Sequence, residues 1–251
     1  MSVRDKVALV TGAGRGIGEA IADRLAAQGA AVAVCDLDPE AAAKAAGRLV
    51  ERYGVRASGV GADISDSAAV HAAVERVIGE LGPVDVLVNN AAVDVIGRFV
   101  DSAEGTWNRI IDVNLRGTIT VTRAVLDSMI ESGGGRIVHI ASDAGRVGSS
   151  GEVVYSATKG GVIAFGKALA REVARHGITV NSVCPGPTDT ALLGQVADYS
   201  QRMYDATVRA IPLRRVAQPD EIAGVVAFLA SDDAAYMTGQ TLSVSGGLTM
   251  V

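Results

Sequence analysis

Hydrophobic residues in this chain gather in short, nearly continuous runs, which are separated by longer stretches with a helical pattern. The runs are rich in Val and Ile and fall at 7–12, 31–36, 57–63, 84–90, 136–142, 178–186 and 241–247. Strands that are buried on both faces have this pattern, because polar residues do not alternate along them. The runs therefore predict seven strands of a parallel sheet.

The stretches between the runs carry apolar residues at helical spacing. They fall at 16–28, 39–53, 66–81, 104–131, 153–175 and 219–231. Alternation of strand and helix from end to end predicts an α/β fold, with right-handed crossovers and helices on both faces of the sheet. No Pro/Ser-rich linker and no internal repeat divides the sequence, so we expect one domain that spans residues 1–251.

One segment breaks this alternation. Residues 187–214 follow the sixth predicted strand, contain helical pieces but no strand, and are too long for an ordinary connection. Ligands of open α/β sheets bind beyond the carboxyl ends of the strands, so we expect a helical lid over a substrate site. A surface insertion is the alternative.

Composition narrows the class of protein. The chain is 49% hydrophobic and 4% aromatic, and its net charge of −5 argues against a nucleic-acid partner bound by charge alone. It has neither an apolar stretch of membrane-spanning length nor a signal-peptide apolar region, which predicts a soluble, cytoplasmic protein without a membrane partner. Cys35 and Cys184 are expected to be buried free thiols, and no spacing of metal ligands is present.

A glycine-rich turn directly follows the first predicted strand. It reads T-G-x3-G-x-G from Thr11 to Gly18, which differs from the G-x-G-x-x-G pattern. Gly12 permits the tight turn, Gly16 permits close backbone approach, and Gly18 lets the helix pack on the sheet. Amides at the N-terminus of the following helix then face a pyrophosphate, which predicts a dinucleotide cofactor. The contacts expected in this turn are Gly12, Arg15, Gly16, Ile17 and Gly18.

Asp36 ends the second predicted strand, eighteen residues after Gly18. A carboxylate at this point accepts hydrogen bonds from the adenosine ribose and repels a 2′-phosphate, which favours NAD over NADP. Arg15 is the opposing signal, because a cation in the glycine turn attracts a 2′-phosphate. The alternative role of Asp36 is a turn cap ahead of Asp38. Asp63, which ends the third predicted strand, is expected to bind the adenine amino group, to cap a helix, or to do both.

Tyr155 and Lys159 stand four residues apart in a predicted helix, and Ser142 lies thirteen residues before the tyrosine. Residues at i and i+4 share a helical face, so a phenol and an ammonium group lie side by side. Ionising a free tyrosine at pH 7 costs about 4 kcal/mol, because its pKa is near ~10. A neighbouring lysine lowers that pKa, and the pair would then act as a general acid or base.

These residues occur together with further motifs in the order typical of one family. The motifs are TGAGRGIG at 11–18, Asp63, NNAA at 89–92, Asn114, Ser142, YSATK at 155–159, NSVCPG at 181–186 and TGQTLSVSGG at 238–247. Over essentially its full length, the chain resembles the short-chain dehydrogenase/reductase family. Within that family it is most similar to dehydrogenases of hydroxyacyl-CoA thioesters, such as the 2-hydroxycyclohexanecarboxyl-CoA dehydrogenases.

The resemblance implies a Rossmann-like, doubly wound fold and an NAD-dependent interconversion of a secondary alcohol and a ketone. It implies that Tyr155 is the catalytic acid/base and that Lys159 lowers the tyrosine pKa and holds the nicotinamide ribose. Ser142 would bind the substrate oxygen, and Asn114 would support a water that links the lysine to solvent. The implied cofactor contacts outside the glycine turn are Asp36, Asp63, Ile64, Asn90, Ala91, Tyr155, Lys159, Pro185, Gly186, Thr188 and Thr190.

The resemblance also implies a homotetramer, in which the helices at 104–131 and 153–175 pair across a dimer interface. Four basic residues are expected either to bind CoA phosphates or to be ordinary surface charges: Arg98, Arg146, Arg202 and Arg209. His71 and His176 are expected at the surface. His139 interrupts an apolar strand and is expected to be neutral with its hydrogen bonds satisfied, and Trp107 is expected to pack or to line an interface.

Other functions remain as alternatives to the NAD-dependent interconversion of a secondary alcohol and a ketone. A reductase of the 3-oxoacyl carrier-protein type, working with NADPH, is opposed by Asp36. A non-catalytic dinucleotide sensor or scaffold is opposed by the complete set of Asn114, Ser142, Tyr155 and Lys159. A nucleotide-sugar epimerase is disfavoured by the short chain and by the glycine pattern.

Overall fold

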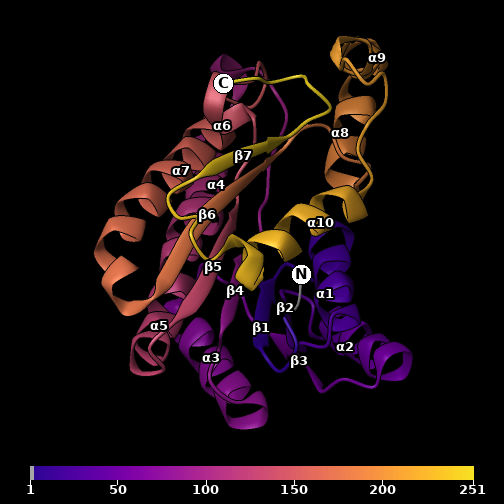
Figure 1. The fold of residues 1–251 in the computed structure, drawn as a ribbon. Helices are drawn as coiled ribbons and strands as arrows, with labels where there is room; N and C mark the ends of the chain where they lie inside the picture. The colour runs from indigo at the N-terminus through magenta and orange to yellow at the C-terminus, as the bar shows by residue number, and fades with distance from the viewer. Residues whose placement is uncertain (1–2) are drawn as a thin grey trace.

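A seven-stranded parallel sheet forms the centre of the computed structural model, which describes residues 3–251 (Figure 1). The strands run in the spatial order β3-β2-β1-β4-β5-β6-β7. Their bounds are β1 Val7–Thr11, β2 Ala31–Asp36, β3 Ala57–Gly61, β4 Val86–Asn89, β5 Gly135–Ile140, β6 Ile178–Pro185 and β7 Thr241–Val244. The predicted parallel sheet of seven strands is therefore confirmed.

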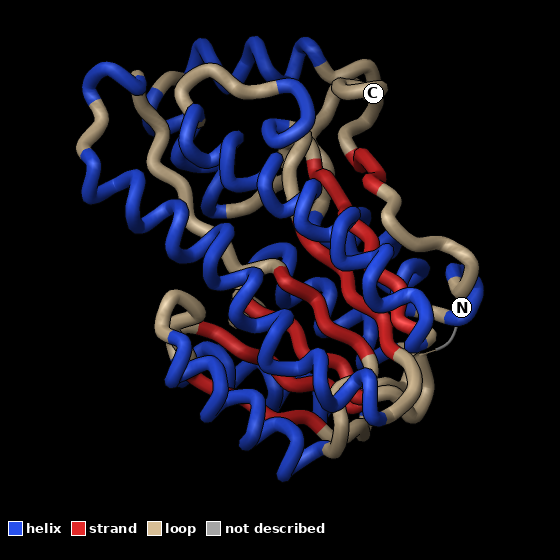
Figure 2. Tube along the Cα trace, turned by 90° about the vertical axis from the view of Figure 1, so that its left-hand side faces the viewer, coloured by secondary structure: helices blue, strands red, loops and turns tan. Residues whose placement is uncertain are grey.

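Helices cover both faces of this sheet (Figure 2). One face packs against α1 (Gly16–Ala27), α2 (Pro39–Tyr53) and α10 (Pro219–Ala230). The other face packs against α3 (Ser67–Leu81), α5 (Thr118–Glu131) and α7 (Val153–Val173).

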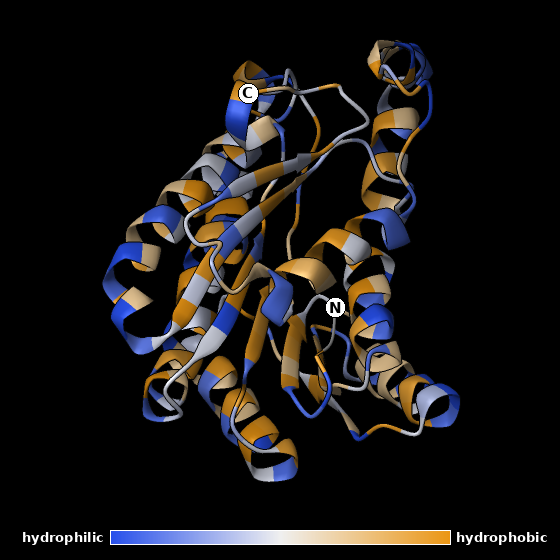
Figure 3. Ribbon diagram, viewed as in Figure 1, coloured by the Kyte–Doolittle hydropathy of each residue, from blue (hydrophilic) through white to orange (hydrophobic). Residues whose placement is uncertain are grey.

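Successive side chains of a strand point into different layers of the core. In β1, Ala8 and Val10 belong to the core under α1, whereas Val7 and Leu9 belong to the core under α3. Both faces of the strand are thus buried, which explains why apolar residues run continuously through the sheet (Figure 3).

Local signals in the sequence fix the ends of several helices. Asp38 caps α2 by accepting hydrogen bonds from the backbone amides of Glu40 (2.9 Å) and Ala41 (3.2 Å), and Pro39 occupies the first turn. Gly54 ends the same helix in the left-handed conformation that glycine adopts without strain. Both ends of α2 are therefore set by residues that lie next to them in the sequence.

The remaining elements are short. They are η1 Phe99–Asp101, α4 Glu104–Ile111, η2 Asp112–Gly117, α6 Ala144–Val147, η3 Ala174–His176, α8 Ala191–Tyr199, α9 Gln201–Ala210 and η4 Asp232–Ala234. The helix expected at 104–131 is thus not uniform, because η2 is a π-helical turn between α4 and α5. The expected segment 187–214 contains two helices, α8 and α9, and Figure 1 shows that they stand out from the sheet.

Strand order places a crevice at the centre of the sheet. After β3 the chain returns to the middle and adds β4 on the other side of β1, so the order reverses between these two strands. Ligands of such sheets bind at this point, outside the carboxyl ends of the strands. Thr11 ends β1 and Asn89 ends β4, and the predicted glycine turn and the NNAA motif follow them directly.

Candidate active site

The glycine turn after β1 depends on close contacts that only glycine allows. Gly12 has a φ of +62°, and a Cβ added to it would lie 2.7 Å from Ala91 Cα. A Cβ on Gly18 would lie 2.3 Å from the carbonyl oxygen of Gly12, in the place where α1 begins against the sheet. Asn90 closes the turn, because its Nδ2 donates to the carbonyl oxygens of Thr11 (2.9 Å) and Gly12 (3.0 Å).

Gly12→Ala is therefore expected to destabilise the fold. The left-handed conformation alone costs a side chain of order 1–3 kcal/mol, and the contact with the Ala91 backbone adds to it. Thermal unfolding measures the loss, and an NADH titration should show weaker binding. Gly79→Ala is the matched control, since Gly79 lies exposed within α3 and nothing approaches its Cβ within 4 Å. The Gly79→Ala variant should unfold at the same temperature as the wild type or at a slightly higher one. Equal losses of thermal stability in both variants would show that the conformation and contacts of Gly12 are not the cause.

The geometry of this turn fits the phosphates of a dinucleotide. Gly16 has a φ of +63° and opens α1, and the nearest atom to an added Cβ is Thr190 Cγ2 at 3.8 Å. A side chain at Gly16 would thus point into open space between the glycine turn and the loop after β6. Arg15 is exposed and makes no side-chain cap of α1, so the first amides of the helix remain available to an anion.

Asp36 lies beside this turn and holds part of it in place. Its Oδ2 accepts a hydrogen bond from the Gly14 amide (2.8 Å), and its Oδ1 accepts one from the Asp38 amide (3.1 Å). The alternative role as a turn cap is thus present in the structure. A carboxylate offers about four acceptor positions, so two hydrogen bonds leave capacity for ribose hydroxyls.

Asp63 follows β3 and is engaged by neighbours. Its carboxylate accepts hydrogen bonds from Ser65 and from Arg109 Nη1 (3.2 Å). Burial acts to raise the pKa of Asp63, but the hydrogen bonds from Ser65 and the charge of Arg109 lower the pKa below its ordinary value. The carboxyl of Asp63 therefore stays ionised at neutral pH. Ile64 is buried next to it, and its side chain packs against Gly117.

Tyr155 and Lys159 lie side by side in the first turns of α7, as their spacing predicts. The Lys159 Nζ lies 5.5 Å from the centroid of the Tyr155 ring and donates a hydrogen bond to the carbonyl oxygen of Ile140 (2.7 Å). Both side chains are buried. Burial lowers the pKa of Lys159 to about 8.

The pKa of Tyr155 shifts opposite to the direction that the spacing predicts. Burial raises it, and the nearby carboxyls of Glu152 and Asp94 raise it further. The hydrogen bond with Ser142 lowers it, but by less. The contribution of Lys159 to this pKa therefore stays a prediction. The net rise has another cause, because burial and the two acidic side chains near the phenol outweigh the hydroxyl of Ser142.

Ser142 directly follows β5 and meets Tyr155 from the other side. Its hydroxyl lies close enough to the Tyr155 hydroxyl to lower the pKa of the tyrosine, and its Oγ accepts a hydrogen bond from the Ala144 amide (3.1 Å). Two hydroxyl groups therefore converge on one point beside the carboxyl end of the sheet. This arrangement can bind one oxygen atom of a substrate and move a proton to or from it.

Asn114 lies in the π-helical turn η2 and is fully buried. Its Oδ1 accepts a hydrogen bond from the Val93 amide (2.8 Å), and its Nδ2 donates to the Val93 carbonyl oxygen (2.8 Å) and to Thr158 Oγ1 (3.4 Å). The side chain thus ties the loop after β4 to the helix that carries Tyr155. Single-turn π-helices often occur at functional sites, and this one aims Asn114 into the site.

The loop after β6 carries the remaining residues that were predicted to contact the cofactor. Thr188 Oγ1 donates to the Gly186 carbonyl oxygen (2.9 Å), and Thr190 Oγ1 donates to the Thr188 carbonyl oxygen (3.2 Å). Thr190 also caps α8, so the start of the helical segment and the glycine turn face each other. On the β4 side, the amides of Asn90 and Ala91 both donate to Thr11 Oγ1. Sequence reasoning did not single out Thr11, although it is the polar residue that ends the first strand.

A sequence model of a protein family, described as "Enoyl-(Acyl carrier protein) reductase", matches residues 12–249. The chain belongs to the short-chain dehydrogenase/reductase family. It is 41% identical to the 3-oxoacyl-[acyl-carrier-protein] reductase FabG of Escherichia coli, over 100% of both chains. It is also 41% identical to the (3R)-3-hydroxyacyl-CoA dehydrogenase of Rattus norvegicus, over 100% of this chain and 98% of the other. The crystal structure of levodione reductase superposes with a TM-score of 0.93 at 31% identity, over 97% of each chain.

As a member of the short-chain dehydrogenase/reductase family, the chain is an oxidoreductase that acts between hydroxyl and keto groups. The described helices include none with the length and apolar character needed to cross a membrane.

Both cysteines are free and buried, as predicted. Burial raises the pKa of Cys35 to about 12 and that of Cys184 to about 11. Neither thiol is therefore a nucleophile at neutral pH.

The four arginines that were expected either to bind CoA phosphates or to be surface charges lie in different segments of the fold. Arg98 pairs with Asp101 (3.6 Å) at the surface, and Arg146 Nη1 donates to Ser243 Oγ (2.6 Å). Arg202 and Arg209 are both exposed on α9. The last two remain the candidates for a phosphate contact.

His139 is fully buried in β5, and burial lowers its pKa to about 3, so it is neutral as predicted. Its Nδ1 lies 3.1 Å from Asn89 Nδ2, but its Nε2 has no hydrogen-bond partner among residues 3–251. The expectation of a fully satisfied ring is therefore wrong for that nitrogen.

His71 is exposed and His176 is half-buried. Trp107 stacks on Phe99, with 5.2 Å between the ring centroids.

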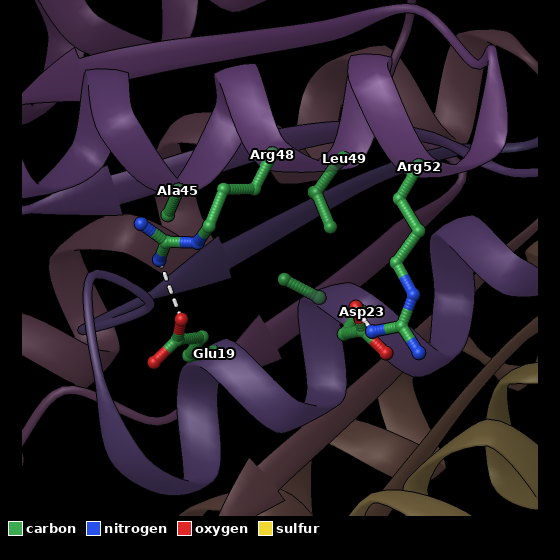
Figure 4. Close-up of a pocket in the computed structure, with 7 residues that line it drawn as sticks. Glu19, Asp23, Ala45, Arg48, Leu49 and Arg52 are labelled. Carbon is green, nitrogen blue, oxygen red and sulfur yellow. Dashed lines mark hydrogen bonds and ion pairs between the residues drawn. The ribbon is translucent and has the colours of Figure 1, made fainter.

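A hollow lies between α1 and α2, and Tyr155 is not among the residues that line it (Figure 4). It has a volume of about 150 Å³ and is spanned by the ion pairs Arg48–Glu19 and Arg52–Asp23. Each arginine already faces a carboxylate, so the hollow offers no free charge to a ligand. It also lies on the face of the sheet opposite α7, and no predicted catalytic residue lines it.

Sequence reasoning missed two carboxyl groups at the site, Asp94 and Glu152. They come from the loop after β4 and from the residue before α7. Both lie in segments that flank the predicted motifs, and the signal for them was only their proximity in sequence to NNAA and to Tyr155.

Proposed function

We propose that this chain is an NAD(H)-dependent oxidoreductase that interconverts a secondary alcohol and a ketone, with Tyr155 as the acid/base. The observation that carries the proposal is the convergence of the Ser142 and Tyr155 hydroxyls, with Lys159 buried beside them, next to the glycine turn. Ser142 comes after β5, whereas Tyr155 and Lys159 lie in the first turns of α7. The fold therefore brings the three side chains together.

In this mechanism the substrate oxygen lies between Ser142 and Tyr155. During oxidation Tyr155 takes the hydroxyl proton, and during reduction it returns a proton to the oxygen. Lys159 holds the nicotinamide ribose, and Asn114 supports a water that connects the lysine to solvent. The bound nicotinamide supplies the hydride acceptor or donor, and its positive charge in the oxidised form favours the phenolate.

The preference for NAD over NADP rests on Asp36. The carboxylate lies against the Gly14 amide, where the adenosine ribose of a bound dinucleotide would approach. A 2′-phosphate at that position would meet a negative charge. The residues proposed to hold the cofactor are those of the glycine turn, Asp36, Asp63, Ile64, Asn90, Ala91, Tyr155, Lys159, Pro185, Gly186, Thr188 and Thr190.

We propose a hydroxyacyl-CoA, including a cyclic one, as the substrate. The name of the Rattus norvegicus relative, a (3R)-3-hydroxyacyl-CoA dehydrogenase, supports this class. The segment 187–214 would act as the lid, and its exposed Arg202 and Arg209 would contact the CoA phosphates. Reduction of a 3-oxoacyl group on the acyl carrier protein with NADPH is the second candidate, supported by the FabG relative of Escherichia coli.

We also propose that the whole chain acts as one domain and assembles as a homotetramer in the cytoplasm. Ile111 and Ile119 support the assembly, because both are exposed apolar residues on α4 and α5. Burying them against a second copy would remove apolar surface from water. Size-exclusion chromatography with light scattering measures the assembly.

A turnover screen tests the proposed function. NAD reduction is followed with CoA-linked hydroxy acids, free hydroxy acids, cyclic alcohols and sugars, and NADPH oxidation is followed with a 3-oxoacyl carrier protein. Turnover of a hydroxyacyl-CoA with NAD supports the proposal, and a clear preference for the carrier protein with NADPH supports the second candidate. NADH binding without any turnover would instead indicate a non-catalytic sensor or scaffold.

The pH dependence of the reaction should follow Tyr155. Burial raises the pKa of this tyrosine, so its protonated form dominates at neutral pH. Alcohol oxidation needs the deprotonated form, and kcat/KM for oxidation is expected to rise with pH across the neutral and mildly alkaline range. Initial rates at saturating NAD measure this profile. A profile that falls with pH over the same range would contradict Tyr155 as the base.

A further inference from the structure

Two carboxyl groups face each other at the edge of the site, and the proposed mechanism uses neither. Asp94 lies in the loop after β4, and Glu152 is the residue that precedes α7. The Gly97 amide donates to the Gly151 carbonyl oxygen (3.0 Å), so backbone hydrogen bonding joins the two loops. The carboxyls are therefore held together by the fold rather than by their own interaction.

Asp94 is the inner member of this pair, with only 7% of its surface exposed. Its Oδ1 accepts a hydrogen bond from the Val95 amide (2.8 Å). Its Oδ2 is buried and receives no N–H or hydroxyl hydrogen bond from residues 3–251. Glu152, which is half-buried, acts electrostatically on Asp94 and forms the outer member. Two carboxyls can hydrogen-bond only when one of them holds a proton.

The charges around Asp94 favour that proton. Burial and the neighbouring Glu152 raise the pKa of Asp94 to about 7, whereas Lys159 lowers it by less. An ionised carboxylate without a partner is costly to bury, and two like charges in contact cannot both be ionised without penalty. Near neutral pH a large fraction of Asp94 is therefore protonated, and the site does not hold two full negative charges.

The pair also lies next to the reacting atoms. Both carboxyls act electrostatically on the Tyr155 hydroxyl, and Glu152 is the N-cap residue of α7, three positions before the tyrosine. Asn114 holds the backbone of Val93, the residue before Asp94, through two hydrogen bonds. A substrate whose oxygen reaches Ser142 and Tyr155 thus places its neighbouring atoms against this pair.

We propose that Asp94 and Glu152 form a carboxyl pair that hydrogen-bonds an uncharged oxygen next to the reacting carbon and excludes substrates that carry a carboxylate there. The inference rests on the proposed function and narrows its substrate class. An acyl thioester or ester presents a neutral carbonyl, which accepts a hydrogen bond from the O–H of the protonated carboxyl. A free hydroxy or oxo acid presents an anion, which meets the negative charge of the pair.

The test compares two probes with the same carbon skeleton, ethyl 3-oxobutanoate and the 3-oxobutanoate anion. Dissociation constants are measured by titrating each probe into the NADH complex, and kcat/KM is measured for reduction of each by NADH. The wild type is expected to prefer the ester by roughly 30-fold or more, because like charges in contact strongly disfavour a complex. D94N and E152Q should each reduce this preference by about tenfold, chiefly by improving binding of the anion.

E172Q is the matched control, because Glu172 is an exposed carboxylate near the other end of α7, about 30 Å along the helix from Glu152. It should leave the ratio unchanged. Structural damage in a variant would weaken the binding of both probes to a similar extent. A change in the ratio therefore cannot be explained by such damage.

The outcomes separate this inference from the proposed function. Turnover with a wild-type preference for the anion, or with a ratio that D94N and E152Q do not move, overturns the carboxyl pair and leaves the function intact. Ester-selective binding that depends on both residues, without turnover of either probe, supports the pair and counts against the function. Failure of the ester to bind the NADH complex overturns the inference.

Discussion

Replacing Tyr155 with Phe is expected to lower kcat/KM in both directions by roughly 1,000-fold, because a positioned acid or base contributes about 10²–10⁴-fold. The substitution removes one hydroxyl and keeps the ring, which packs in a buried position beside Lys159. Ser142 can still hold the substrate oxygen, but no group remains to exchange its proton. NADH binding should be nearly unchanged.

Steady-state kinetics and an NADH titration measure the two quantities separately. Tyr236→Phe is the control, since Tyr236 is fully exposed and should tolerate the change without loss of activity. Survival of activity in Tyr155→Phe would show that another group transfers the proton, and the proposed mechanism would then be wrong. Loss of NADH binding together with activity would instead point to a structural defect.

Asp36→Asn is expected to shift the ratio of kcat/KM for NADPH over NADH by roughly 30-fold in favour of NADPH, which corresponds to ~2 kcal/mol. The change removes the negative charge that a 2′-phosphate would meet. An amide oxygen can still accept the hydrogen bond from Gly14, although the amide nitrogen cannot accept the second one, from the Asp38 amide.

Asp38→Asn provides the comparison for this prediction. Asp38 lies two residues further on and caps α2, a position where asparagine serves about as well as aspartate. It should leave the cofactor ratio unchanged. A wild-type enzyme that already prefers NADPH, or an Asp36→Asn variant with an unchanged ratio, would remove the physical basis for NAD specificity and favour the second candidate function.

The places of the proposed catalytic and cofactor residues in the fold could be predicted, because each residue belongs to a local sequence pattern. Tyr155 and Lys159 share a helical face through their spacing alone, and Ser142 follows directly from the end of an apolar run. Gly12 was predictable because a tight turn after a buried strand needs a left-handed residue, and the structure gives it a φ of +62°. Parallel strands align their carboxyl ends, so residues that end different strands meet at one edge.

Other features of the site could not be predicted because they depend on contacts between distant segments. The π-helical turn around Asn114 arises where its side chain binds the backbone of Val93, twenty-one residues earlier. The pKa of Tyr155 rises because the fold buries it beside Glu152 and Asp94. Neither effect leaves a mark in the hydrophobic pattern.

The sequence by itself thus determined the order of strands and helices, the glycine turn and the spacing of Tyr155 and Lys159, because all of these follow from interactions between near neighbours. Only the tertiary structure decided that the Lys159 ammonium bonds the Ile140 carbonyl and that the carboxyls of Asp94 and Glu152 meet. The physical reason is that burial and the electrostatic field of a group depend on which segments surround it. Spacing along one helix sets distances within that helix, but it does not set the charges that other elements bring to it.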